Sequence, residues 1–268
     1  MAGRLLVVIA ALLALLRTSN AAELKSVEVD GTAFKVTLTD GRVLRSPELV
    51  GATLAIATNN SIMRVRIDAV ERDPDAVNGP VWLHTFSTQS RSGAWENPCV
   101  AGPDGRRQGF PLSGRPRADG AMEPAANVFE LICTAGGRGK CVRFGYQPWA
   151  DGSLRDMFNA CVRLLRADYC GNGVSTTRNG TLVNIYDDLG IQKAEDVPNL
   201  EFEAGWGANG AVCVRHVRIK DNISPQALVA ACPRLKNLVG AICTEEKARS
   251  LGGQIFNQSK PRCSRLNE

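Results

Sequence analysis

The stretch SLRDMFNACVRLLRADYCGNG (153–173) determines how the second half of this chain folds. Its apolar residues recur every three or four positions, which is the period of an α-helix that buries one face. Ser153 and Asp156 have the types and spacing of a helix N-cap and a capping-box variant. The pattern predicts one main amphipathic helix over 153–167, with an apolar stripe made of Leu154, Met157, Phe158, Cys161, Leu164 and Leu165.

Short strands joined by tight turns are expected on both sides of this helix. Asp-Gly and Asn-Gly pairs between alternating apolar residues mark two-residue hairpin turns, because both turn positions need a positive φ. No helix of useful length is expected before residue 150, and Cys141 is expected to begin a strand. The expected cross-strand pairs are Val29–Thr32, Leu38–Val43, Thr177–Leu182 and Trp206–Cys213.

The predicted fold class is α+β, with an antiparallel, sheet-rich N-terminal part followed by a disulfide-stapled α+β unit that contains the main helix. A second helix is expected to begin at Ser224-Pro225 and to end near Cys232, because serine followed by proline is typical of a helix start. The expected segments are a signal peptide (1–21), a β-rich unit (22–90), a Gly/Pro/Arg-rich linker or surface loop (91–125), an α+β domain (126–220) and a helical, cysteine-containing extension (221–268).

The first 21 residues have the pattern of a secretory leader. Arg4 supplies a positive start, Leu5 to Leu16 are apolar, and Ser19 and Ala21 occupy the small-residue positions of a cleavage site. The apolar run is too short to span a bilayer, and no transmembrane segment is expected after its removal. We therefore expect export to the periplasm or the extracellular space.

Composition and charge exclude several classes of protein. Hydrophobic residues make up 44% of the chain, which excludes a long disordered or fibrous protein. The formal net charge of +5 falls to +3 without the leader, which contains two arginines and no acidic residue. Because the chain also lacks a basic stripe, nucleic acid is not an expected partner.

Cysteine usage indicates covalent cross-linking. All nine cysteines follow the leader, and an oxidising compartment favours their pairing into at most four bridges with one thiol left over. Spacing leaves the connectivity open, except that a turn centred on Gly137 would place Cys133 opposite Cys141, so a bridge between these two is predicted. The candidates are Cys99, Cys133, Cys141, Cys161, Cys170, Cys213, Cys232, Cys243 and Cys263.

The stretch DMFNACVRLLRADYCGNG, with CVRFGYQPW before it and FEAGWGANGAVCV after it, resembles the bacterial ADYC-domain family. That family is named for the tetrapeptide that stands here at 167–170, and the resemblance extends over about 126–215. It implies an exported protein and supplies no mechanism. Histidines that family members carry near the helix cysteine and after the motif are replaced here by Phe158 and Thr176.

Two hypotheses of function follow. The leading one is an exported, disulfide-stabilised binding or interaction module without enzymatic activity, whose partner is a protein or a cell-envelope glycan. The alternative is an exported hydrolase with a site formed by Cys170, Asp168 and His216. Cys170 follows the C-terminus of a helix, where the helix dipole raises the pKa of a thiol, and this favours the first hypothesis.

Other chemistry-bearing residues have ordinary structural explanations. No spacing of Cys or His matches a metal site, and no cofactor motif is present, so neither a metal nor a cofactor is expected. His84 is expected to be a hydrogen-bonded core residue on an apolar strand face. Four aromatic residues could line a ligand groove or pack in the core, namely Tyr146, Trp149, Tyr169 and Tyr186.

Overall fold

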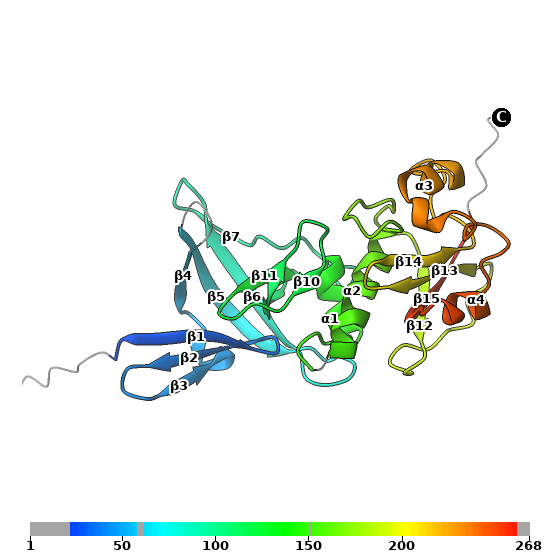
Figure 1. The fold of residues 1–268 in the computed structure, drawn as a ribbon. Helices are drawn as coiled ribbons and strands as arrows, with labels where there is room; N and C mark the ends of the chain where they lie inside the picture. Colours follow the sequence, from blue (N-terminus) through cyan, green and yellow to red (C-terminus); the bar gives the residue numbers. More distant parts are fainter. Residues whose placement is uncertain (1–21, 58–61, 151, 262–268) are drawn as a thin grey trace, which may run out of the picture.

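The computed structural model describes residues 22–57, 62–150 and 152–261. Helices α1 (Gly137–Arg143) and α2 (Gly152–Arg166) lie between a sheet from the N-terminal half and a sheet from the C-terminal half (Figure 1). Both sheets are antiparallel, so the predicted α+β class is confirmed. The expected leader (1–21) and Cys263 lie outside the described residues.

The N-terminal half contains three groups of strands. A three-stranded sheet packs against a six-stranded sheet of order β11-β8-β6-β5-β4, with β7 on β6, and β9 and β10 form a separate ribbon. The elements are β1 (Leu24–Asp30), β2 (Ala33–Leu38), β3 (Val43–Arg45), 3-10 helix η1 (Ser46–Leu49), β4 (Thr53–Ala57), β5 (Ile62–Arg72), β6 (Trp82–Gln89), β7 (Trp95–Glu96), β8 (Gly109–Ser113), β9 (Arg115–Pro116), β10 (Met122–Glu123) and β11 (Phe129–Cys133).

The C-terminal half is a four-stranded sheet of order β12-β15-β13-β14, with short helices at its margins. Its elements are β12 (Val183–Asp187), β13 (Glu201–Gly207), β14 (Gly210–Val214), α3 (Pro225–Ala231), 3-10 helix η2 (Pro233–Leu235), α4 (Glu245–Ser250) and β15 (Ile255–Ser259). The largest apolar cluster joins this sheet to α1, α2 and β8, and it includes Phe110, Phe158 and Trp206.

The main helix is confirmed. Helix α2 buries Met157, Phe158, Cys161 and Leu164 along the predicted stripe. The helix at 225–231 is also confirmed, because the Ser224 side chain accepts a hydrogen bond from the Ala227 amide and caps it.

Three predicted hairpin registers are wrong, the first by two positions and the other two by one. Val29 faces Phe34, and Thr37, rather than Leu38, faces Val43. In the hairpin after β13, Gly205 faces Cys213 while Trp206 faces Ala211, across a bulge. A Cβ at Gly205 would lie 2.5 Å from Ala248, so helix α4 leaves room only for glycine at the bulge.

The predicted pairing of Thr177 with Leu182 is also wrong. The chain turns at 178–181, since the Thr181 amide donates to the Arg178 carbonyl, but no strand precedes the turn. Thr176 instead binds carbonyls at the end of α2, through its amide to Arg166 (3.0 Å) and its hydroxyl to Ala167 (2.6 Å). Strand β12 then pairs with β15.

Two segments expected to be loop or extension contribute central strands. In the 91–125 segment, β8 is buried and pairs with both β6 and β11. In the 221–268 segment, β15 lies between β12 and β13 and buries Ile255 and Phe256. Both strands pair with partners distant in sequence, which local turn signals do not reveal.

The described residues contain four disulfides, Cys99–Cys133, Cys141–Cys161, Cys170–Cys232 and Cys213–Cys243. The predicted Cys133–Cys141 bridge is wrong, because residues 137–143 form α1 and not a strand. A Cβ on Gly139 would collide with the Cys133 carbonyl oxygen, so glycine at this position lets the helix pack closely against the end of β11. Cys141 therefore faces Cys161 of α2.

The connectivity can be checked by peptide mapping. Digestion of the purified protein without reduction should release the four linked peptide pairs named above, since eight of the nine cysteines are joined in them. Loss of one native bridge should cost about 2–5 kcal/mol of unfolding free energy. Recovery of a peptide pair that links Cys133 to Cys141 would contradict the structure.

His84 makes stability depend on pH. Its ring is fully buried, stacks on Phe86 and lies 2.8 Å (Nε2) from the Ser46 hydroxyl, as expected for a core histidine. Burial lowers its pKa to about 4, so the unfolded chain binds the proton more readily than the folded one. The stabilisation of the folded state that results from this lowered pKa is complete above the unfolded pKa of about 6.5. It is lost as the pH falls toward 4.

We expect the unfolding free energy to fall by roughly 2–3 kcal/mol between pH 6.5 and 4 through His84 alone. In the His84→Gln variant, the unfolding free energy should depend less on pH in this range. Urea unfolding at several pH values measures this dependence. An equally steep decline in the variant would show that other groups cause it.

Candidate functional site

The first residue of the motif at 167–170 ends helix α2. Ala167 adopts a left-handed conformation (φ 48°). The amides of Ala167 and Asp168 then donate to the carbonyls of Leu164 (3.0 Å) and Arg163 (2.9 Å). This is the Schellman arrangement, which satisfies carbonyls at a helix C-terminus.

Asp168 holds the following loop against the helix. Its carboxylate is fully buried and accepts hydrogen bonds from Arg163 (2.7 Å) and from the amides of Asn172 (3.1 Å) and Gly173 (2.8 Å). Arg163, 1% exposed, also binds the Asp119 carbonyl oxygen and carboxylate. One ion pair thus fixes the loops around 119 and around 173 to the same helix.

Tyr169 belongs to a second buried network. Its ring stacks on Trp206, and its hydroxyl donates to the Glu203 carboxylate (2.9 Å). Arg218 binds both oxygens of Glu203 (2.9 and 3.0 Å) and donates to the Leu164 carbonyl of α2 (2.9 Å). Asn257 completes the shell of donors around the carboxylate. This network joins the helix to β13 and β15.

The charges in this second network stabilise each other. Burial alone would raise the pKa of Glu203, but the charge of Arg218 and the hydrogen bonds donated by Arg218 and Asn257 together hold that pKa below its usual range. Burial and the adjacent Glu203 carboxylate raise the pKa of Tyr169 well above its usual value, so the phenol stays protonated. Because every group is buried and paired, the network is suited to structure and not to proton transfer.

The residues of the hydrolase hypothesis do not form a hydrogen-bonded site. Cys170 is bonded to Cys232, so its sulfur is not a free nucleophile. Asp168 is bound to Arg163, and His216 Nδ1 lies 3.4 Å from the Val217 carbonyl oxygen. Within the described part of the chain, His216 Nε2 is buried without a hydrogen-bond partner. The arrangement lacks the thiol–imidazole contact that a cysteine hydrolase needs.

Three of the four aromatic candidates are core residues. Tyr146, Tyr169 and Tyr186 are buried, and the hydroxyl of each donates a hydrogen bond to a carboxylate. The acceptors are Asp187 (2.8 Å), Glu203 and Glu245 (2.5 Å), respectively. Trp149 is half-buried and borders a shallow hollow of about 350 Å³ together with Pro148 and Arg155. Of the two alternatives, core packing therefore applies to the three tyrosines, and only Trp149 borders a hollow.

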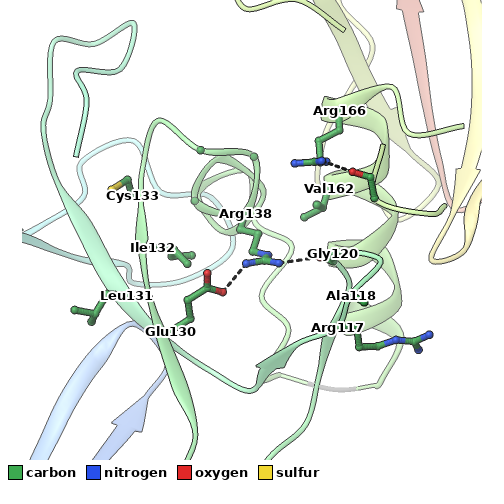
Figure 2. A pocket seen from close by; sticks show the side chains of 14 residues that line it. Arg117, Ala118, Gly120, Glu130, Leu131, Ile132, Cys133, Arg138, Val162 and Arg166 are labelled. Atoms are coloured by element: carbon green, nitrogen blue, oxygen red, sulfur yellow. Dashed lines mark hydrogen bonds and ion pairs between the residues drawn. The ribbon is translucent and has the colours of Figure 1, made fainter. Parts of the chain in front are cut away.

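A larger pocket of about 500 Å³ opens between β11, the start of α1, the end of α2 and the loop at 117–120 (Figure 2). Arg138 extends from α1 into its centre, and Arg166 reaches into it from α2 (Figure 2). Arg117 lies on the rim and points away from both. Glycines contribute much of the remaining wall, namely Gly120, Gly136, Gly137, Gly139 and Gly173.

The pocket arginines differ in how their charge is balanced. Arg138 forms an ion pair with Glu130 (2.5 Å) and donates to the Gly120 carbonyl, and Arg117 pairs with Asp119 (3.1 Å). Among the described residues, Arg166 has no carboxylate within ion-pair distance and donates only to the Gly173 carbonyl. Its Nε is buried and unpartnered there. The pocket thus contains one guanidinium with unused hydrogen-bonding capacity.

Sequence analysis did not single out Arg138, Arg166, Glu203 or Arg218. Arg166 lies off the apolar stripe of α2, which on its own indicates only a solvated face. Their partners lie elsewhere in the chain, so no local spacing marks them.

Two further properties concern metals and membranes. No group of three or more His, Cys, Asp or Glu side chains within 22–57, 62–150 and 152–261 is placed to hold a metal ion. In those same ranges no helix has the length and apolar character required to cross a bilayer.

Comparison with known proteins identifies one family. A family model described as the ADYC domain matches residues 46–220, which confirms the resemblance and extends it back to η1, while strands β1 to β3 precede the match. No curated protein and no solved structure matches the chain.

The Glu203 network can be tested by a matched pair of variants. Glu203→Gln leaves the buried Arg218 charge uncompensated, which should cost about 3–5 kcal/mol of unfolding free energy. Glu201→Gln makes the same change at an exposed position of the same strand, where surface substitutions cost within about 0.5 kcal/mol. Equal denaturation midpoints for the two variants would contradict the assignment.

Proposed function

We propose a binding function for this chain, which belongs to the ADYC-domain family. The protein acts as an exported, disulfide-stabilised module, and its pocket at Arg138 and Arg166 receives a negatively charged group of the ligand. The observation that carries the proposal is Arg166, a pocket arginine without a carboxylate partner in the described part of the chain.

The charge of the pocket supports an anionic ligand. Three arginines line it, and because Arg138 is paired with Glu130 and Arg117 with Asp119, the excess positive charge among the described residues is that of Arg166. Arginine stays protonated at all physiological pH values and presents its N–H groups in a fork that matches a carboxylate or phosphate. A partly enclosed site strengthens this attraction, because surrounding protein screens it less than water does.

The same residues support binding in preference to catalysis. Guanidinium groups stay protonated at neutral pH and cannot act as general bases, and the charge of Glu130 is balanced by its ion pair with Arg138. Catalysis of hydrolysis would need a free nucleophile or a general base, and Cys170 is held in a disulfide.

Two observations support export. Four disulfides form and persist in oxidising compartments and are rare in the cytosol. The leader pattern of 1–21 agrees with that environment. Cell fractionation with the native leader, compared with a variant starting at residue 22, tests this part.

The binding function is tested by calorimetric titration with acidic peptides and uronic-acid oligosaccharides. We expect at least one of these classes to bind, and Arg166→Gln to weaken it by about 10- to 100-fold, as for loss of a hydrogen bond to a charged group. Arg215→Gln is the control, because it removes the same charge at an exposed position outside the pocket. Failure of both classes to bind, or equal affinity in the two variants, refutes the function.

A further inference from the structure

We infer that the pocket ligand is an extended, acidic polypeptide segment that adds as a strand to the free edge of β11. This inference rests on the proposed function and specifies its ligand. It starts from the sheet order, in which β11 pairs with β8 on one side and, among the described residues, with no strand on the other. A sheet edge of this kind presents backbone groups that can pair with another chain.

The register shows which backbone groups of β11 face outward. The Gly114 amide donates to the Val128 carbonyl, and the Thr134 amide donates to the Gln108 carbonyl, both across the β8 side. Because the direction of backbone groups alternates along a strand, Phe129 and Leu131 direct their N–H and C=O groups away from β8. Pro111, which has no N–H, stands opposite Leu131 and fits this register.

The free edge is short and opens into the pocket. Residues 130–133 of β11 line the pocket, and the Cys133 carbonyl is already bound by the Gly136 amide (3.1 Å). The open part therefore comprises the backbone groups of Leu131, which lines the pocket, and of Phe129, which lies just before the lining residues. Among the described residues, the outward-facing N–H and C=O groups of Phe129 and Leu131 have no hydrogen-bond partner.

The pocket walls suit a peptide backbone. Glycines at 120, 136 and 137 carry no side chain that would prevent close approach to the edge strand. Arg138 and Arg166 reach into the same space, so a peptide lying along β11 would present alternate side chains to them. A glutamate or aspartate at such a position complements the unpaired charge of Arg166.

The probes are end-blocked hexapeptides of alternating valine and threonine in which glutamate is moved through the six positions. At least one should bind the wild-type protein, and its glutamine counterpart should bind at least about tenfold more weakly. N-methylation of every second residue should abolish binding, whereas methylation of the intervening residues should leave it within about threefold, since only one set of amides faces β11.

Hydrogen exchange locates the contact. At a peptide concentration of ten times the Kd, exchange of the Phe129 and Leu131 amides should slow by about tenfold. The Val214 amide, which already donates to the Leu238 carbonyl in the distant sheet, is the control and should not change.

The outcomes separate the two proposals. Binding of uronic-acid oligosaccharides but of no peptide would overturn strand addition and keep the anion pocket. Equal sensitivity to methylation at every position, or protection confined to amides elsewhere, would also overturn strand addition. Absence of binding by all ligands would refute both.

Discussion

The buried ion pair between Asp168 and Arg163 is the contact on which the rest of the structure depends. It lies at the end of α2, where Asp168 also fixes the amides of the next loop and Arg163 also fixes the loop at 119. Gly120 and Gly173, which those loops supply, are walls of the pocket. Arg166 is held by the Gly173 carbonyl, so the same pair sets the position of the unpaired guanidinium.

The four residues of the family motif then have distinct structural roles. Ala167 ends the helix, Asp168 fixes the loop, Tyr169 enters the Glu203 network, and Cys170 joins the segment to η2 through Cys232. Each of these roles is structural, and two of them use partners distant in the sequence, Glu203 and Cys232. The pocket proposed to bind a ligand lies beside the motif, which supports its walls.

Elements with local signals could be predicted from the sequence, and elements that depend on distant partners could not. The stripe of α2 and the Ser224 cap were sufficient because period and capping act within a few residues. The burial of β15 and the pairing of Cys141 depend on contacts across the fold. The same holds for the site, since the role of Arg166 depends on its hydrogen bond to Gly173 and on its place in the pocket, and neither is visible in the local sequence.

NMR of the arginine Nε–Hε groups tests directly whether Arg166 binds an acidic ligand. In wild-type protein, the glutamate hexapeptide that binds most tightly should shift the Arg166 signal most and leave the exposed Arg215 signal in place. A saturable shift at Arg166 supports the account. An unchanged Arg166 signal in the presence of bound peptide, or shifts confined to surface arginines, would contradict it.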